Sequence, residues 1–375
     1  MKLIIEPDDG VAPLLSAIKN AKKSVEIVIF RFDRADVEAA LKAAVANGAR
    51  VTALIANANR GGEKNLRKLE LSFLEAGIIV ARTDDDLIRY HDKFMVVDRR
   101  SLYMLSFNFT HLDIDHSRGF GIVTHHAKWV RQAVDLLRAD CTRNPYELGM
   151  DTFVVSPINS RKVLARFLKR AKKELLIYDP KISDDEMLHI LEDRAKAGVA
   201  IRVIGRLTEE VPVSIRKLAQ YRLHTRTIIR DRHQAFVGSQ SLRPAELDSR
   251  RELGLIVRDP QVVKKLLETF ESDWAAAEAP EESDQKKEKN GQEEKDPSKE
   301  AAPADPEEEK NKVVRVLVQE LQPLTTTVKK AVRKAVAEAG EEVVKDKVVK
   351  ATVRKVVKKA VKEAVKEAVQ DAKEA

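Results

Sequence analysis

The sequence predicts an α/β fold made of two homologous halves, followed by a charged linker and a helical tail. Three observations predict it. Segments recur at a constant spacing, strand-like and helix-like runs alternate, and the composition changes sharply after Trp274. We expect halves at residues 1–150 and 151–274, an acidic disordered linker at 275–312 and a basic amphipathic tail at 313–375.

The repeat is the clearest of these observations. Ile4-Ile5-Glu6-Pro7 returns as Val154-Val155-Ser156-Pro157, and Ala21-Lys22-Lys23 returns as Ala171-Lys172-Lys173, both at a shift of 150. Gly48 and Gly198 keep the same register. Several matches on one register indicate a duplicated unit.

Within each half, periodicity predicts alternating helices and strands. Helix-like stretches of about a dozen residues and β-branched runs of four to six residues follow one another, which is typical of an α/β sheet. The expected helices are 12–23, 35–47, 128–138, 160–173, 185–197 and 261–274. The expected strands are 25–30, 50–55, 94–97, 102–105, 121–123, 174–178, 200–204, 227–230 and 254–257.

The segment after Trp274 is rich in Glu, Lys, Pro and Ala and has no aromatic residue up to residue 309. Such a segment buries too little apolar surface to offset its chain entropy, so we expect disorder. Valines then recur every fourth residue, as in Val353, Val357, Val361 and Val365, with alanines beside them and Lys and Glu on the other faces. This pattern predicts amphipathic helices.

Charge and cysteine content restrict the class of protein. Residues 1–274 carry a net charge of +8, residues 275–309 of −8 and residues 310–375 of +8. The basic parts favour anionic partners, either phospholipid headgroups or nucleic acid. One cysteine, Cys141, excludes an intramolecular disulfide, and no long apolar run or signal-like start is present. The sequence predicts a cytoplasmic protein that can also lie on a membrane surface.

One motif occurs in both halves. His91-Asp92-Lys93 is followed after four residues by Asp98, and His224-Thr225-Arg226 is followed after four residues by Asp231. Ser106 and Ser239 come eight residues after the aspartates. The two histidines differ by 133 positions instead of 150, so the first half has about 17 extra residues between Ile55 and His91, with residues 57–64 as part of them.

The motif suits phosphodiester chemistry. Alternate residues of a strand share a face, so His91 lies beside Lys93 and His224 beside Arg226. If the halves meet about a pseudo-twofold axis, two imidazoles and two cations face one cleft. The cations stabilise phosphate charge, one imidazole attacks phosphorus and the other protonates the departing oxygen. Neither a metal nor another cofactor is required.

These residues resemble the phospholipase D superfamily, whose signature is a duplicated HxK(x)4D(x)6GSxN, and the resemblance covers about residues 1–274. It implies two phospholipase D-like lobes forming a pseudo-twofold pair and a covalent phosphohistidine intermediate. It also implies His91 and His224 as nucleophile and general acid, Lys93 and Arg226 as phosphate ligands, and support from Asp98 and Asp231. The implied substrate-binding residues are Ser106, Asn108, Ser239 and Glu252.

The sequence departs from the signature at four positions. Arg226 stands for Lys, Leu105 for the first Gly and Ser241 for the second Asn, and Gly119 lies where a match to Glu252 is expected. An Arg is a bulkier planar cation than a Lys. We favour His91 as the nucleophile because its Lys93 and Asn108 are intact.

Three functions follow from this pattern. The first is a phospholipase D or phosphatidyltransferase that resembles cardiolipin synthase-like members without transmembrane helices. The second is a metal-independent nuclease of the same superfamily. The third is a degenerate, non-catalytic scaffold that binds anions. Residues 313–375 are expected to bind an anionic membrane, nucleic acid or a partner helix. The sequence does not define an oligomeric state.

Overall fold

The computed structural model describes residues 1–57 and 63–279, and the side chains of residues 63–65 lie outside this description. The predicted tail and the predicted linker from residue 280 onward are likewise outside the described residues. The description therefore concerns the two predicted halves.

The first lobe alternates strands and helices before ending in a long helix. Its helices are α1 (Ala12–Lys19), α2 (Ala35–Ala46), α3 (Glu63–Glu75), α4 (His111–Asp115) and α5 (Ala127–Thr142). Its strands are β1 (Lys2–Glu6), β2 (Ser24–Ile29), β3 (Arg50–Ile55), β4 (Ile79–Arg82), β5 (Arg89–Tyr90), β6 (Phe94–Val97), β7 (Ser101–Leu105) and β8 (Ser117–Thr124). Buried Val, Ile and Leu residues fill β2 and β3, as expected for interior strands.

The second lobe repeats this order without a counterpart of α3. Its helices are α6 (Ser160–Lys169), α7 (Asp185–Lys196), α8 (Pro244–Asp248) and α9 (Pro260–Ala276). Its strands are β9 (Phe153–Ser156), β10 (Glu174–Ile182), β11 (Ala200–Leu207), β12 (Ser214–Arg216), β13 (Arg222–Leu223), β14 (Arg226–Arg230), β15 (Gln234–Gly238) and β16 (Arg250–Val257). The extra residues predicted between Ile55 and His91 thus include α3.

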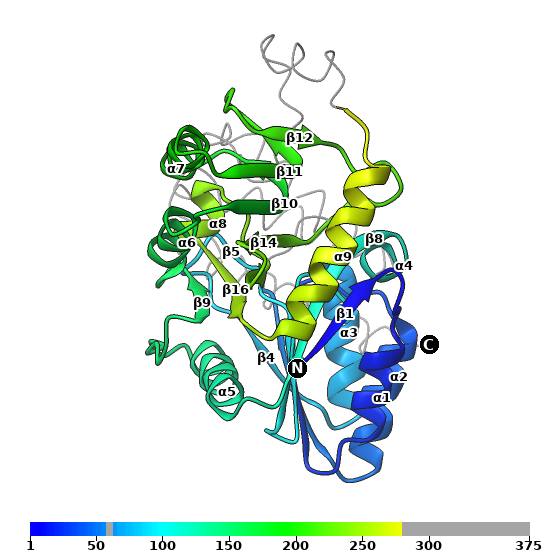
Figure 1. The fold of residues 1–375 in the computed structure, drawn as a ribbon. Coiled ribbons are helices and arrows are strands. Elements are labelled where there is room, and N and C mark those ends of the chain that lie inside the picture. The colour runs from blue at the N-terminus through cyan, green and yellow to red at the C-terminus, as the bar shows by residue number, and fades with distance from the viewer. Residues whose placement is uncertain (58–62, 280–375) are drawn as a thin grey trace, which may run out of the picture. The chain divides into compact units, whose positions relative to one another are not determined.

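Each lobe has one mixed sheet, and the two sheets exchange a short strand. The first sheet runs β1-β8-β7-β6-β2-β3-β4 and the second runs β12-β11-β10-β14-β15-β16 with β9 on β16. Strand β5 of the first lobe pairs with β16, and β13 of the second lobe pairs with β8. Figure 1 shows β5 beside β16, among the strands of the second lobe. The exchange ties the residues before β6 and β14 to the opposite lobe.

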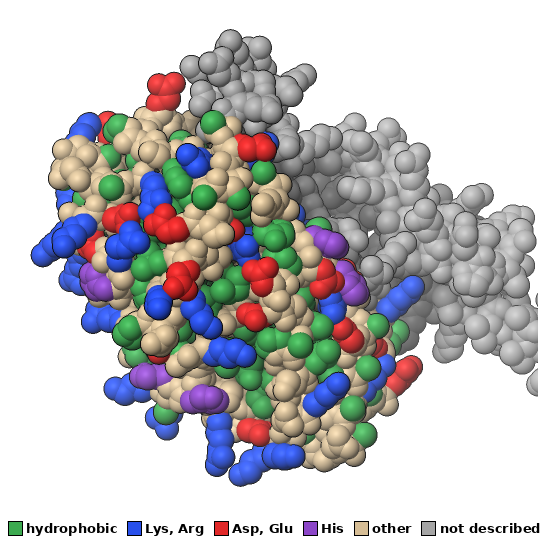
Figure 2. Space-filling view, turned by 45° about the vertical axis from the view of Figure 1, so that its right-hand side comes forward, with side chains coloured by type: hydrophobic (Ala, Val, Ile, Leu, Met, Phe, Trp, Pro, Cys, Tyr) green, Lys and Arg blue, Asp and Glu red, His purple; other side chains and the backbone are tan. Residues whose placement is uncertain are grey.

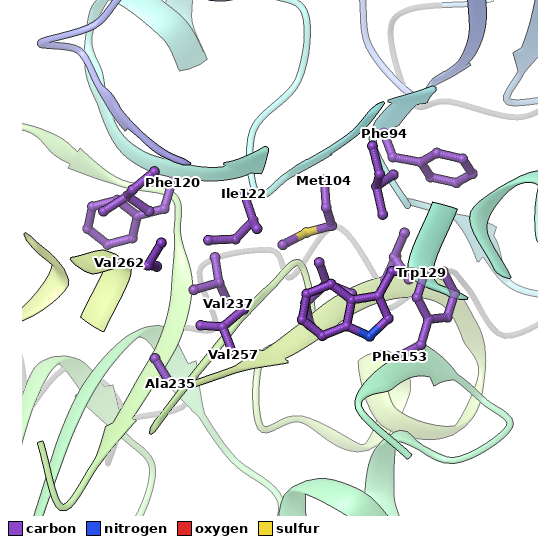
Figure 3. Close-up of a cluster of buried hydrophobic side chains, with 14 of the residues drawn as sticks. Phe94, Met104, Phe120, Ile122, Trp129, Phe153, Ala235, Val237, Val257 and Val262 are labelled. Atoms are coloured by element: carbon purple, nitrogen blue, oxygen red, sulfur yellow. The ribbon is translucent and has the colours of Figure 1, made fainter. Parts of the chain in front are cut away.

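Three apolar clusters hold these layers together. One lies between the first sheet and α1–α3, another between the second sheet and α6–α8, and the largest lies between the two sheets with α5 and α9. Figure 3 shows Phe120, Ile122 and Met104 of the first sheet facing Val237 and Val257 of the second. The inner faces of the sheets therefore form one shared core, which fixes the orientation of the lobes.

Two buried ion pairs cross between the lobes in a reciprocal manner. Arg118 on β8 bonds to Asp273 on α9, with Nε 2.8 Å from Oδ2, and Arg251 on β16 bonds to Asp140 on α5, with Nη2 3.0 Å from Oδ1. The two arginines are 133 positions apart, and so are the two aspartates. The pairs are therefore related by the pseudo-twofold axis of the duplication.

Candidate active site

His91 and His224 each lie just before a strand, which agrees with the strands predicted at 94–97 and 227–230 but not with the assumption that each histidine shares a strand with its Lys or Arg. The strands begin at Phe94 and Arg226, and the backbone N–H groups of the histidines bond to the other lobe. His91 donates to the carbonyl of Arg251 at 2.8 Å, and His224 donates to the carbonyl of Arg118 at 3.2 Å. Because these segments bond to the opposite lobe, the regular pairing of β6 and β14 with their own sheets begins only after the histidines.

His91 is held by a carboxylate of the opposite lobe. Its Nδ1 lies 2.8 Å from Oε2 of Glu252, and both side chains are buried. The ring also packs edge-on against Phe30, with centroids 4.5 Å apart. Because Nδ1 is engaged, Nε2 is the nitrogen left for a substrate. Burial, together with Lys93 and Arg226, holds the pKa of His91 well below its usual value, so its neutral form prevails at neutral pH.

His224 is held differently from its counterpart. Gly119 occupies the position equivalent to Glu252, and Nε2 of His224 instead lies 3.5 Å from Oδ2 of Asp113 on α4. Its Nδ1 is buried without a partner. Asp113 also accepts hydrogen bonds from Arg222 at 2.8 Å and from the backbone of Asn108 at 2.9 Å. The two imidazoles therefore sit in chemically different surroundings.

Lys93 and Arg226 connect the two half-sites electrostatically. Each cation lowers the pKa of both His91 and His224, although burial is the larger cause for each histidine. The charges of both motifs thus act on the same small volume. Burial also lowers the pKa of Lys93 to about 7. Arg226 is fixed by bonds to Oγ of Ser241 at 3.1 Å and to the carbonyl of His224 at 2.6 Å.

The two predicted serines contact backbone in this structure. Oγ of Ser106 accepts a hydrogen bond from the N–H of Phe120 at 2.9 Å, and Oγ of Ser239 accepts one from the N–H of Leu253 at 3.2 Å. Both hydroxyls join the loop after the motif to the strand that carries the inter-lobe arginine. Asn108 donates from Nδ2 to Asp113 at 2.6 Å, and its Oδ1 is buried without a partner.

Asp98 and Asp231 lie away from the histidines, in contrast to their expected place in the catalytic set. Each follows the strand whose other end comes just after the motif histidine, in a turn with positive φ. Asp98 accepts N–H groups of Lys22, Lys23 and Ser24, and Asp231 does the same for the three equivalent residues of the second lobe. Four residues of extended strand separate each aspartate from the site. The two aspartates therefore hold the first residues of β2 and β10 in place and do not line the cleft.

Two carboxylates of the short helices are absent from the predicted set of site residues, although the segment from Asp113 to Arg118 was expected to be able to line the cleft. Asp113 on α4 and Glu246 on α8 are 133 positions apart, the same register as the histidines. Glu246 bonds to the N–H of Ser241 at 2.7 Å and lies 3.9 Å from Nε of Arg226. The shared register was the signal that could have revealed both residues.

The family described as "Cardiolipin synthase, PLD-like domain" matches residues 14–140 and 205–274, more than half of the chain. The chain belongs to the phospholipase D superfamily. The matched segments include both histidine motifs and both inter-lobe arginines. No curated protein sequence matches this phospholipase D-like chain significantly.

Solved structures share the fold of this phospholipase D-like chain at low sequence identity. Polyphosphate kinase from Porphyromonas gingivalis superposes with a TM-score of 0.63 and 18% identity over 72% of this chain, which spans only 46% of the kinase. Phosphatidylserine synthase from Haemophilus influenzae Rd KW20 superposes with a TM-score of 0.57 and 12% identity, over 74% of this chain and 87% of the synthase. The superpositions show a shared fold, but at such low identities they do not indicate which reaction this chain catalyses.

Within residues 1–57 and 63–279, none of the helices combines the length and apolarity needed to cross a bilayer. The cytoplasmic location inferred from the sequence stays a prediction.

Proposed function

We propose that the chain hydrolyses or transfers phosphodiesters through a phosphohistidine on His91, with phospholipids as substrates. The observation that carries the proposal is the 2.8 Å contact between Nδ1 of His91 and Glu252 of the opposite lobe. A carboxylate at Nδ1 directs Nε2 outward and stabilises positive charge on the ring as it attacks. His224 lacks such a bond, which supports His91 as the nucleophile.

The reaction would proceed in two displacements. Nε2 of His91 donates its electron pair to phosphorus, the bond from phosphorus to the leaving alcohol breaks, and His224 supplies a proton to the departing oxygen. Water or an acceptor alcohol then attacks phosphorus, the P–N bond breaks, and the attacking oxygen gives its proton to His224. Hydrolysis and transfer therefore differ only in the acceptor.

The surrounding charges suit each role. Lys93 and Arg226 would bind the non-bridging oxygens and stabilise the charge of the transition state. Asp113 raises the pKa of His224 even though burial lowers it more strongly. A bound phosphodiester brings a negative charge that offsets Lys93 and Arg226, which favours the protonated form of His224 when it is needed.

The choice of phospholipid rests on the matched family and on the basic character of residues 1–274. The alternative is that the chain is a nuclease and acts on nucleic acid. The decisive experiment incubates the purified full chain with phosphatidylglycerol and, separately, with single- and double-stranded DNA, all in EDTA. We expect lipid turnover. DNA cleavage without lipid turnover contradicts the phospholipid assignment.

Variants test the roles of the two residues that carry the proposal. His91→Ala is expected to lower turnover on the order of 10³-fold or more, and Glu252→Gln about 10²- to 10⁴-fold by analogy with other carboxylate–histidine pairs. His189→Ala, at an exposed histidine of α7, is the matched control and should retain turnover. Full activity of His91→Ala would contradict the role of His91, and absence of turnover in the wild-type chain would favour the non-catalytic scaffold.

A labelled substrate should also leave an acid-labile phosphate on the protein. We expect peptide mapping to locate the label on His91. A label on His224 in the wild-type chain would reverse the two roles and overturn the argument from Glu252.

A further inference from the structure

A second group of basic side chains gathers far from His224, at the opposite end of β14. The group lines a hollow of about 620 Å³ formed by the end of α6, the end of α7 and the turn after β14. On the face seen in Figure 2, much of the Lys and Arg is interspersed with Asp and Glu. The basic residues of the hollow are Lys169, Arg170, Lys172, Arg194, Arg230 and His233.

Few carboxylates compensate these cations. The acidic residue of the hollow, Asp231, uses its carboxylate to accept the N–H groups of Lys172, Lys173 and Glu174. Lys169 has Glu186 at 3.6 Å, whereas Arg170 and Arg194 pair with no carboxylate in the part of the chain that the structure describes.

Two guanidinium groups also have buried N–H donors without an acceptor. They are Nε of Arg194 and Nε of Arg230. The other nitrogens of Arg230 bond to the carbonyl of Phe167 and to Gln234, so the group is fixed with Nε unsatisfied. A buried donor on a cation is costly unless an acceptor satisfies it.

The first lobe shows that the fold does not need these arginines. In its equivalent turn Asp98 makes the same backbone contacts, yet Asn20, Ala44 and Val97 stand where the second lobe has Arg170, Arg194 and Arg230. Ala44 and Val97 are buried in the apolar cluster of that lobe. Apolar packing at this place is thus compatible with the turn. In the second lobe Arg230 stacks on the ring of Phe167, with Cζ 4.4 Å from the ring centroid, whereas Arg170 and Arg194 require another explanation.

We propose that this hollow binds a phosphate group, carried either by a soluble phosphate ester or by a lipid headgroup. A phosphate offers several oxygen acceptors to the guanidinium groups that line the hollow, and its negative charge compensates the surrounding cations. The site is separate from the cleft of His91 and His224, because β14 lies between them. It would let the chain hold a phosphate-bearing molecule without turning it over.

The test follows arginine Nε–H resonances of the full chain by ¹⁵N NMR during titration with inorganic phosphate. We expect two Nε resonances to shift, one of which is absent from the spectrum of Arg194→Ala. Unchanged Arg194 and Arg230 resonances at saturating phosphate would overturn the proposal. The titration is done on the wild-type chain, and Arg194→Ala serves only to assign one resonance.

A double variant transplants the first lobe's residues, Arg170→Asn with Arg194→Ala. It should weaken phosphate binding to the hollow at least about 10-fold, because two charge-assisted contacts are lost. Turnover in the cleft should be unchanged. The control removes two exposed cations at the equivalent place of the first lobe, Lys19→Asn with Arg100→Ala, and should keep both phosphate sites. Equal phosphate isotherms for the two double variants contradict the proposal.

Vesicles of phosphatidylcholine with and without phosphatidic acid identify the source of the phosphate. If the transplant variant loses binding to vesicles that contain phosphatidic acid, the ligand is a headgroup. If it loses only free phosphate, the ligand is a soluble ester. Either result supports the site.

Discussion

At the scale of single residues, Lys93 links the proposed site to pH. Its ammonium is almost completely buried, and burial lowers its pKa to about 7. The lysine therefore loses its positive charge as the pH rises through about 7, although a bound anion would shift this loss upward. Lys93, which is proposed to bind phosphate, thus titrates near neutral pH because its amine is buried beside Arg226.

We expect the KM for a phosphodiester to rise above about pH 7, and Lys93→Arg to remove most of this rise, because an arginine stays charged. Steady-state kinetics from pH 6 to pH 9 check this. Parallel KM profiles for the two proteins would mean that another group titrates.

Asp92, between the two catalytic candidates of its motif, is a second unusual residue. Both carboxylate oxygens are buried without a partner, and burial, together with Asp140, raises its pKa to about 8. The second lobe has Thr225 at this position. In the unfolded chain the carboxyl ionises near pH 4, so from about pH 4 to pH 8 the folded state binds more protons and stability falls as the pH rises.

Asp92→Asn should therefore reduce the loss of stability between pH 5 and pH 8, with the remainder attributable to other buried carboxyls whose pKa is raised, such as Asp140, Glu6 and Asp179. Urea unfolding at both pH values measures the difference, and Asp85→Asn, at an exposed position of the same lobe, is the control. An undiminished pH dependence in Asp92→Asn would show that Asp92 is ionised in the folded protein.

At the scale of elements, the turns after β6 and β14 determine where β2 and β10 begin. Asp98 and Asp231 adopt φ values of 54° and 50° and accept three consecutive backbone N–H groups each. Burial raises the pKa of Asp98, but these hydrogen bonds outweigh it and lower the pKa below its usual value. Although Asp98 belongs to the sequence motif, its carboxylate therefore stabilises the backbone turn and does not take part in the site.

Asp98→Ala is expected to lower the free energy of unfolding by about 1–3 kcal/mol, because three N–H groups lose their acceptor. The kcat of the folded fraction should be close to that of the wild type. Urea unfolding combined with active-site titration separates the two effects. Unchanged stability with a large loss of kcat would return Asp98 to the catalytic set.

At the scale of the whole molecule, the reciprocal pairs Arg118–Asp273 and Arg251–Asp140 join the lobes beside the proposed site. The carbonyls of the same arginines accept the N–H groups of His224 and His91. Lobe association and histidine placement therefore depend on the same residues. A buried ion pair of this kind is costly to break on one side only.

We expect Asp140→Leu to destabilise the chain by about 3–5 kcal/mol, since it leaves Arg251 buried without its partner. Adding Arg251→Met should recover much of this loss, because no unpaired charge then remains. Denaturant unfolding of the two single variants and the double variant completes a double-mutant cycle. Additive losses in that cycle would show that the pair is not coupled.

Much of the fold follows from local pattern. Strands 50–55 and 94–97 agree with the structure to the residue, and the helix predicted from Ala12 ends at Lys19 instead of Lys23. The difference has a tertiary cause, because Asp98 takes the N–H groups of residues 22–24 for a turn. Short elements such as α4, β5 and β13 escaped prediction since they have too few residues for a period and depend on contacts with neighbouring segments.

By itself, the sequence determined the duplication, the α/β class and the two motifs, because regular periods and fixed spacings are properties of the chain. Only the tertiary structure decided that Glu252 bonds to His91 while Asp113 lies beside His224, and that Asp98 and Asp231 stay outside the cleft. It also brought Arg170, Arg194 and Arg230 to one hollow. These arrangements come from strands and helices crossing between lobes or from distant turns meeting, and such contacts have no fixed separation along the chain.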